Sequence, residues 1–310
     1  MLSQNTTVLK SCLLFTILFL FLSTSCTKNS KLPNSSNQKF PEVTLFGTET
    51  RILHSNIVNE DFELYISFPS SYFKSDTVYP VLFCLDANRS FGLVCNLVNV
   101  LSMPHNEIPE ILIVGIGYRI NGMEDWGALR RRDFTPTHDP KSDKYWVDLL
   151  SRLSGRDNIV VRSGGAQKFL EFISTELIPF IESNYRVSST DRALLGYSAG
   201  GIFTFYTLFQ HPEIFKRYFA GSPSIDWDNG IVFKYENEYA ATHKDLPVRL
   251  FMSAGNLESE TMLKNMKKMA GQLQSRSYPY LELETHIFEN ETHASCYAVA
   301  VSRGLKILYK

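Results

Sequence analysis

The stretch that decides the fold is Gly196-Tyr197-Ser198-Ala199-Gly200-Gly201, between the short apolar run 192–196 and the apolar segment 201–211. The run is predicted to be a buried strand, and the segment after it a helix. Small residues two positions before and two after the serine let strand and helix approach closely, so the serine sits on a tight, strained turn. The Ser198 hydroxyl is thereby raised at the carboxyl end of a sheet, where helix amides can stabilise a developing negative charge.

Strands and helices alternate on both sides of this turn. Segment 62–68 alternates apolar and polar residues, which is typical of a strand with one buried and one solvent-exposed face. Other short apolar runs do not alternate, which suits strands of a parallel sheet buried on both faces. The predicted strands are 62–68, 79–85, 111–117, 192–196, 247–253 and 280–288, and the predicted helices are 166–185 (kinked at Pro179), 201–211, 258–275 and 294–309. The chain is therefore predicted to be α/β, with the α/β-hydrolase fold: a mostly parallel central sheet with helices on both faces.

A serine hydroxyl at neutral pH needs a neighbouring base, and the base needs an orienting acid. In this fold their chain order is serine, acid, histidine. We assign the base to His293, in a loop between the last strand and the last helix, from which an imidazole can reach Ser198. The other downstream histidines fit less well: His211 ends the helix after the serine, His243 lies in a polar loop, and His286 lies inside a strand.

The acid is expected just past the strand that precedes the last one. Glu258 stands there, and Glu260 is the near alternative; either could instead be a first-turn charge of the next helix. The backbone N–H of Ala199 is the first candidate for the oxyanion hole. A second donor is expected after an early central strand, where the N–H groups of Ala87 and Asn88 are candidates and Asp86 could pin the loop.

Arg130-Arg131-Arg132 is the only dense cationic run of the chain. One interpretation is a patch that holds an anionic or catecholate substrate; the other is an Arg132–Asp133 pair that braces a loop, with the other arginines solvated. Segment 121–162 is expected to roof the site and is polar, with aromatic residues interspersed. Arginine beside aromatic rings favours flat, electron-rich or anionic groups over long acyl chains.

These residues together resemble the esterase-D-like branch of the α/β hydrolases, a family of putative esterases, and most closely the bacterial siderophore esterases that cut catecholate trilactones. The segments that carry the likeness are 79–88, 114–118, 131–136, 164–169, 196–201, Ser222-Pro-Ser224 with Trp227, and Glu291-Thr-His293. The resemblance implies hydrolysis of a carboxylic ester through an acyl-enzyme, with Ser198 as nucleophile and His293 as base. Tyr197 and Trp227 become candidate substrate contacts.

The sequence departs from that family at two places: Tyr197 stands where His is common, and Ala87 where Gly is common. The identity of the ester stays open, because the branch also includes general carboxylesterases and acyltransferases. Two alternatives to hydrolysis are a ligand-binding lipoprotein that kept the fold without turnover, and an acyltransferase or peptidase. The order of serine, acid and histidine favours hydrolysis, since a pure binder needs none of it.

Composition excludes several other classes of protein. A chain with 44% hydrophobic and 20% charged residues is ordinary for a globular domain, and a net charge of −1 predicts no nucleic-acid partner. Cys84, Cys95 and Cys296 are odd in number and irregularly spaced, so they predict no disulfide framework. No Cys/His spacing predicts a metal site, and no cofactor is expected. A small-molecule ester is the expected partner, and the oligomeric state stays open.

Residues 1–25 read as a signal peptide, in which Lys10 precedes the apolar run Cys12–Leu22 and small residues precede Cys26. The run is short for a membrane span. Small residues followed by Cys resemble a bacterial lipoprotein signal, which would lipidate Cys26, although Ser23 stands where Leu is usual. Residues 26–40 read as a flexible tether and 41–310 as the catalytic domain. We therefore expect export to the periplasmic or outer cell-envelope surface, with plain secretion and an uncleaved anchor as alternatives.

Overall fold

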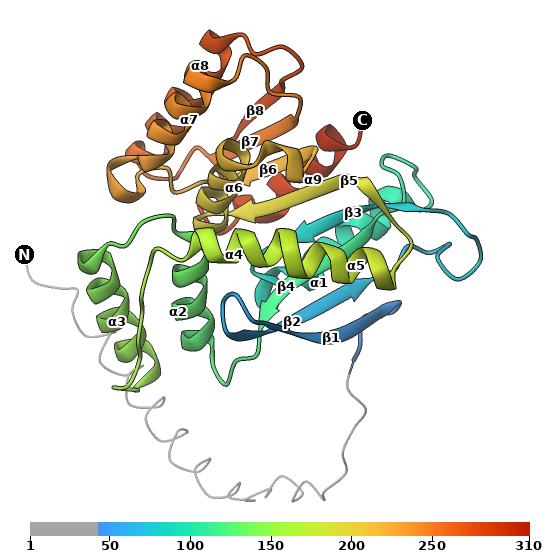
Figure 1. The fold of residues 1–310 in the computed structure, drawn as a ribbon, viewed down its shortest axis with the longest axis horizontal. Helices are drawn as coiled ribbons and strands as arrows, with labels where there is room; N and C mark the ends of the chain where they lie inside the picture. Colours follow the sequence, from blue (N-terminus) through green and yellow to red (C-terminus); the bar gives the residue numbers. More distant parts are fainter. Residues whose placement is uncertain (1–42) are drawn as a thin grey trace, which may run out of the picture. The chain divides into compact units, whose positions relative to one another are not determined.

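The computed structural model, which describes residues 43–310, is built on an eight-stranded sheet in the order β1-β2-β4-β3-β5-β6-β7-β8 (Figure 1). The strands are β1 Thr48–Ser55, β2 Glu60–Ser67, β3 Tyr79–Cys84, β4 Leu112–Tyr118, β5 Val187–Tyr197, β6 Arg217–Gly221, β7 Arg249–Gly255 and β8 Glu282–Phe288. The β1–β2 and β2–β4 pairs are antiparallel, and every other pair is parallel. The prediction of a mostly parallel α/β-hydrolase sheet is confirmed.

Burial along the strands follows the pattern of apolar residues. Strand β2 alternates between buried and partly exposed positions, whereas every residue of β4 is buried, because β4 lies inside the sheet with both faces covered. Strand β6 was absent from the predicted strands; it is short, and Arg217 and Tyr218 give its start a polar character. Its place between β5 and β7 is set by pairing rather than by a local signal.

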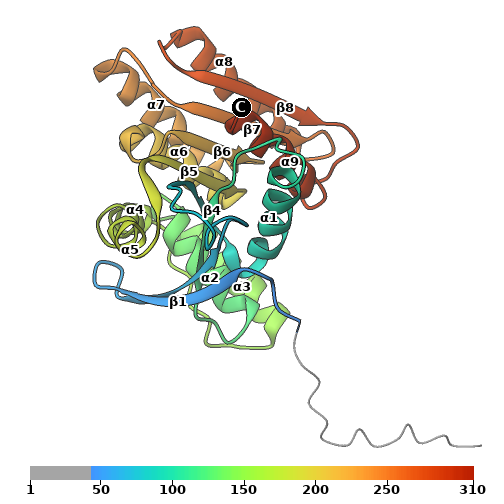
Figure 2. The ribbon, with the colours of Figure 1, turned by 90° about the vertical axis from the view of Figure 1, so that its right-hand side faces the viewer.

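Helices cover both faces of the sheet. Their bounds are α1 Ala87–Ser102, α2 Met123–Phe134, α3 Pro140–Ser154, α4 Ala166–Phe172, α5 Ile178–Asn184, α6 Ala199–Gln210, α7 Ile231–Thr242, α8 Glu260–Arg276 and α9 Cys296–Leu308. Helices α1 and α9 pack their apolar side chains on one face, and α4 to α8 pack on the other. Figure 2 shows α1 and α9 on one side of the sheet and α4 and α5 on the other.

The predicted kink in helix 166–185 takes the form of a π-helical turn, Ile173–Leu177, between α4 and α5. The N–H of Ile178 donates to the carbonyl of Ile173, five residues back. Pro179 follows at once and has no N–H to donate, so the regular pattern of hydrogen bonds cannot run through this point. The helix nevertheless stays buried on one face, where Phe169 and Ile181 pack into the core.

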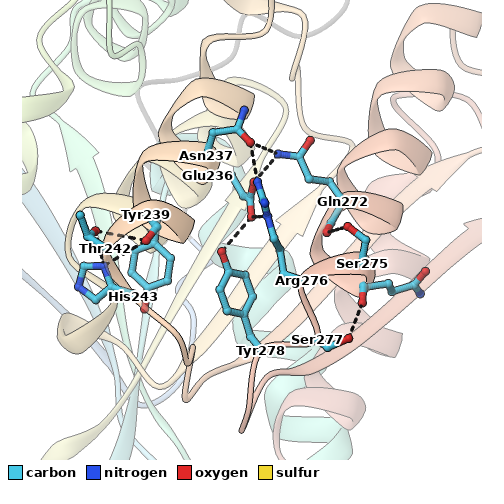
Figure 3. A network of polar contacts seen from close by, with 11 residues as sticks. Glu236, Asn237, Tyr239, Thr242, His243, Gln272, Ser275, Arg276, Ser277 and Tyr278 are labelled. Carbon is cyan, nitrogen blue, oxygen red and sulfur yellow. Dashed lines mark hydrogen bonds and ion pairs between the residues drawn. The ribbon is translucent and has the colours of Figure 1, made fainter.

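A polar network joins α7 to α8 on the outer part of the fold (Figure 3). The buried Glu236 of α7 accepts hydrogen bonds from Arg276 and Gln272 of α8 and from the hydroxyl of Tyr278. The two Arg276 bonds are both 3.0 Å long. A buried carboxylate needs such partners, because unpaired charge is strongly disfavoured away from water.

Residues 45–310 form one compact unit. The predicted signal peptide 1–25, the tether 26–40 and the predicted lipidation site Cys26 lie outside the described residues. In the part of the chain that the structure describes, no helix combines the length and the apolar character needed to cross a membrane.

Candidate active site

Ser198 stands alone between the end of β5 and the start of α6, in a backbone conformation with φ 58° and ψ −115°. Non-glycine residues rarely adopt a positive φ, and such strain concentrates at functional positions. The turn is possible because Gly196 and Gly201 lack side chains. A β-carbon on Gly196 would collide with the Gly200 carbonyl and the Thr204 hydroxyl, and one on Gly201 would lie 2.8 Å from Pro223.

The side chain of Glu258 pairs with the imidazole of His293. Glu258 Oε2 lies 2.7 Å from His293 Nδ1, and its other oxygen accepts from the Ser222 hydroxyl at 2.6 Å and the Gly255 N–H at 2.8 Å. Only 1% of the Glu258 side chain is exposed, against 44% of the His293 side chain. Burial alone would raise the pKa of Glu258, but the hydrogen bonds from His293, Ser222 and Gly255 outweigh burial and lower that pKa.

This arrangement assigns the tautomer of His293 from its partners. An ionised carboxylate can only accept, so Nδ1 carries the proton that points at Glu258 and Nε2 is left to accept one. Ser198 and His293 line the same cavity, and Ser198 Oγ lies 3.5 Å from Ser224 Oγ. The chemistry open to this group is transfer of a proton from a serine hydroxyl to a positioned imidazole.

The cavity beside Ser198 has a volume of about 890 Å³. It is lined by residues at or just past the ends of β3 and β5, by the first turn of α1, by segment 293–297 and by α2 and α3, which lie next to each other in Figure 1. Segment 121–162 therefore does border the site, but its cavity side is more apolar than the sequence suggested. That side carries Met123, Trp126, Trp146, Leu150 and Leu153 alongside the charges of Glu124, Arg130 and Arg131.

Asp86 lies where β3 ends and α1 begins, with a φ of 57°. Its two carboxylate oxygens accept from Arg130 Nε at 2.7 Å and Arg130 Nη2 at 2.8 Å, and both side chains are almost fully buried. Burial opposes the charge of Arg130, but Asp86 more than offsets it and raises the pKa of the guanidinium. Asp86 thus pins this loop, as one of the sequence interpretations proposed.

The predicted oxyanion donors lie at the starts of two helices. Ala199 is the first residue of α6, and Ala87 and Asn88 are the first two of α1, where backbone N–H groups lack partners within the helix. Since β3 and β5 are parallel neighbours, the two helix starts lie at the same edge of the sheet. The Asn88 side chain is used elsewhere: it donates to the Tyr118 carbonyl and accepts from the Tyr118 N–H, both at 2.9 Å.

The three consecutive arginines have three different environments. Arg130 is held by Asp86, as described. Arg131 lines the cavity, with its guanidinium 3.8 Å from the Trp146 ring centroid and its buried Nε without a hydrogen-bond partner among the described residues. Burial and the neighbouring charge of Arg130 lower the pKa of Arg131 to about 9.

Two predicted substrate contacts are corrected by the structure. Arg132 does not line the cavity; it binds Asp133 at 2.7 Å and Glu60 at 2.9 Å, because its helix position points it toward β2. Trp227 is also absent from the cavity wall, since its indole N–H donates to Thr137 at 3.0 Å. Tyr197 does line the cavity, although its hydroxyl bonds to protein groups.

The remaining alternatives lie away from His293 or Ser198. Glu260 is the first residue of α8, His286 lies in the edge strand β8, His211 ends α6, and His243 ends α7. Ser222, which donates to Glu258, was given no role from the sequence, although it lies directly after β6 and within a segment that carries the family resemblance. In the range 43–310, no group of three or more His, Cys, Asp or Glu could hold a metal ion. Cys84, Cys95 and Cys296 are buried free thiols.

The chain is similar in sequence and in structure to known esterases. A family model described as "Putative esterase" matches residues 152–278. The ferri-bacillibactin esterase BesA of Bacillus subtilis is 33% identical over 272 residues, which span 85% of this chain and 90% of that protein. A siderophore enterobactin esterase of Emericella nidulans is 32% identical over 223 residues, 64% of this chain and 71% of the relative. A crystal structure of the BES protein from Bacillus cereus superposes with a TM-score of 0.74 at 27% identity, covering 89% of this chain and 99% of that one.

Proposed function

This chain is an esterase and belongs to the same esterase family as these relatives; from that premise we propose that it cleaves its substrate through a Ser198 acyl-enzyme, with His293 as base and Glu258 as orienting acid. The observation that carries the proposal is the pairing of Glu258 with His293 Nδ1 at 2.7 Å, together with the cavity that His293 and the strained Ser198 both line.

In the proposed reaction, His293 Nε2 takes the Ser198 proton while Ser198 Oγ adds to the ester carbonyl. The negative charge that develops on the carbonyl oxygen is stabilised by N–H groups at the helix starts, Ala199 first among them. The imidazolium then gives its proton to the leaving alcohol, and the carbon–oxygen bond breaks to leave the acyl-enzyme. Water, activated by the same imidazole, releases the acid and restores Ser198. Glu258 stabilises the imidazolium and holds its ring in one orientation.

We further propose that the natural ester is of the siderophore type or otherwise aromatic, and that it carries negative charge. Relatives of this chain are named as siderophore esterases. Within the cavity, Arg131 stacks on Trp146 and its buried Nε has no hydrogen-bond partner among the described residues, so an anionic group would find a desolvated donor there. Trp126, with Arg89 and Arg130 above its ring, adds a second aromatic surface.

The direct test screens purified residues 41–310 against short acyl esters, feruloyl esters and siderophore trilactones, with fluorophosphonate labelling in parallel. We expect label on Ser198 alone, and a higher kcat/KM for aromatic or trilactone esters than for long acyl chains. Tight binding of these compounds without turnover would contradict the proposed chemistry and identify a binding protein. A preference for long acyl chains would contradict the substrate class alone.

We also propose that the mature chain begins at a lipidated Cys26 and is held at a membrane surface by this anchor. Support comes from the apolar run Cys12–Leu22, the small residues before Cys26 and the polar residues after it. Intact-mass measurement of protein from the membrane fraction tests it. A free amine at residue 26 on a soluble protein would contradict the anchor.

A further inference from the structure

Tyr197, the residue directly before the nucleophile, reaches across the site to the loop that carries the base. Its hydroxyl donates to the backbone carbonyl of His293 at 2.8 Å and lies 2.7 Å from the Ser222 hydroxyl. Ser222 in turn donates to Glu258 at 2.6 Å. The side chain of Tyr197 therefore contacts the base loop directly and the acid through one intermediate hydroxyl.

Counting protons shows how this network is shared. Tyr197 and Ser222 have one hydroxyl proton each, while an ionised Glu258 and a backbone carbonyl can only accept. Tyr197 gives its proton to the His293 carbonyl, so Ser222 has one proton for two acceptors, Glu258 at 2.6 Å and the Tyr197 oxygen at 2.7 Å. Burial raises the pKa of Tyr197 well above its usual range, so this hydroxyl keeps its proton at neutral pH.

The ring of Tyr197 is fixed independently of its hydroxyl. It packs edge-on against Tyr297, with centroids 4.8 Å apart, and lies 5.3 Å from the imidazole of His293. Gly221 on the neighbouring strand provides the room for this ring, because a β-carbon there would lie 2.5 Å from Cδ2 and 3.0 Å from Cε2 of Tyr197. Removing the hydroxyl alone should therefore leave the ring in place.

We propose that Tyr197 is a positioning residue, whose hydroxyl holds the His293 loop at a fixed distance from Ser198 and lies against the Ser222 hydroxyl behind Glu258. The inference rests on the proposed catalytic roles of Ser198, His293 and Glu258. It gives a function to the position where this sequence departs from the family pattern, since the tyrosine hydroxyl extends far enough to reach a backbone carbonyl 96 residues away in the chain.

The test compares Tyr197→Phe with Tyr206→Phe, a matched control that removes a hydroxyl from α6 outside the residues that line the cavity. For Tyr197→Phe we expect kcat on a small neutral ester to fall about 10-fold, as for one lost hydrogen bond, with KM changed less than about 2-fold. Fluorophosphonate labelling of Ser198 should slow in proportion. The control should match the wild type in all three.

A second measurement does not depend on turnover. The NMR resonance of the His293 Nδ1 proton reports its bond to Glu258, and in Tyr197→Phe it should broaden or exchange faster with water. An unchanged kcat together with an unchanged resonance would overturn the inference, as would a rise in KM alone, which would make Tyr197 a substrate contact. A wild-type enzyme that hydrolyses no ester would contradict the proposed function instead, and the resonance would still decide the role of Tyr197.

Discussion

Two buried glutamates of this protein each accept several hydrogen bonds, but one lies beside the candidate active site and the other joins two helices. Glu258, beside the cavity, accepts from His293, Ser222 and the Gly255 N–H. Glu236, between α7 and α8, accepts from Arg276, Gln272 and Tyr278 (Figure 3). Their side chains are 1% and 0% exposed, and in both the hydrogen bonds overcome burial to lower the pKa.

The two sites differ in the side chain that pairs with the carboxylate: His293 pairs with Glu258, and Arg276 pairs with Glu236. His293 carries an imidazole, a group that can accept and return a proton, and it shares a cavity with Ser198, whereas the guanidinium of Arg276 contacts Glu236 and Asn237. A buried carboxylate with a lowered pKa is therefore a poor marker of function by itself. The partner's ability to exchange a proton, and an open cavity beside it, identify the candidate site.

The largest expected effect comes from removing the proposed nucleophile, Ser198, which lines the cavity. Ser198→Ala should lower ester turnover about 10⁴–10⁶-fold, because the remaining groups have nothing to activate. Folding should be unaffected, since the hydroxyl has only a 3.5 Å contact with Ser224. Initial rates and thermal melts of both proteins measure this. Turnover near the wild-type level would refute the nucleophile assignment.

Loss of the base should be nearly as severe. His293→Ala removes the proton acceptor while Glu258 keeps the Ser222 and Gly255 donors, so activity should fall by about 10⁴-fold or more. His286→Ala, on the edge strand β8, is the matched control and should change turnover less than about 2-fold. The reverse ranking of the two variants in kcat would show that the wrong histidine was chosen.

The two glutamates can be compared directly by the same substitution. Glu258→Gln should lower kcat about 10²–10⁴-fold, because the imidazole loses its orienting charge. Glu236→Gln should leave kcat within about 2-fold but lower the free energy of unfolding by about 1–3 kcal/mol, as for hydrogen bonds to a charged group. Kinetics and urea denaturation of both variants decide it. Loss of turnover in Glu236→Gln, with Glu258→Gln active, would contradict the proposed roles of the two glutamates.

Arg131 and Arg132 extend the comparison to guanidinium groups. Arg131→Ala should lower kcat/KM for an anionic ester by about 1–3 kcal/mol, roughly 5–150-fold, and have little effect on a neutral ester of matched reactivity. Arg132→Ala should show no such discrimination, because Arg132 is paired with Asp133 and Glu60 outside the cavity. Equal losses on both esters for Arg131→Ala would remove its proposed role.

The smallest expected effect is on the pH dependence of stability. The pKa of Glu236 is lower in the folded protein than the value of about 4.3 for an exposed glutamate. Its contribution is therefore present above that pH and lost as the pH falls through the lower, folded value. Glu236→Gln should flatten the decline of Tm below about pH 4.5. The effect is modest because the Arg276 side chain is 34% exposed. Parallel curves for wild type and variant would contradict it.

The sequence predicts local structure correctly where the residues that determine it lie within one short segment, as at the turn around Ser198. The spacing of Gly196, Ser198 and Gly200 predicted the turn. In the structure, close contacts require glycine at Gly196 and at the following Gly201, whereas a β-carbon on Gly200 would meet only ordinary contacts. Helices α2 and α3, like α1 and α7, were not among the predicted helices; half of the residues of α2 and a third of those of α3 are charged. They are held by packing against each other and by the Asp139 cap of α3.

Apolar runs and spacing along the chain are enough to predict the α/β-hydrolase fold, the turn at Ser198 and the order of the candidate serine, acid and histidine. Three further facts come from the folded molecule: Glu258 rather than Glu260 meets His293, Arg131 lines the cavity beside Trp146 while Arg132 does not, and Tyr197 contacts the loop of His293. The physical reason is distance along the chain. The bonds of His293 to Glu258 and to Tyr197 join residues 35 and 96 positions apart, and strand order in the sheet sets which of them meet.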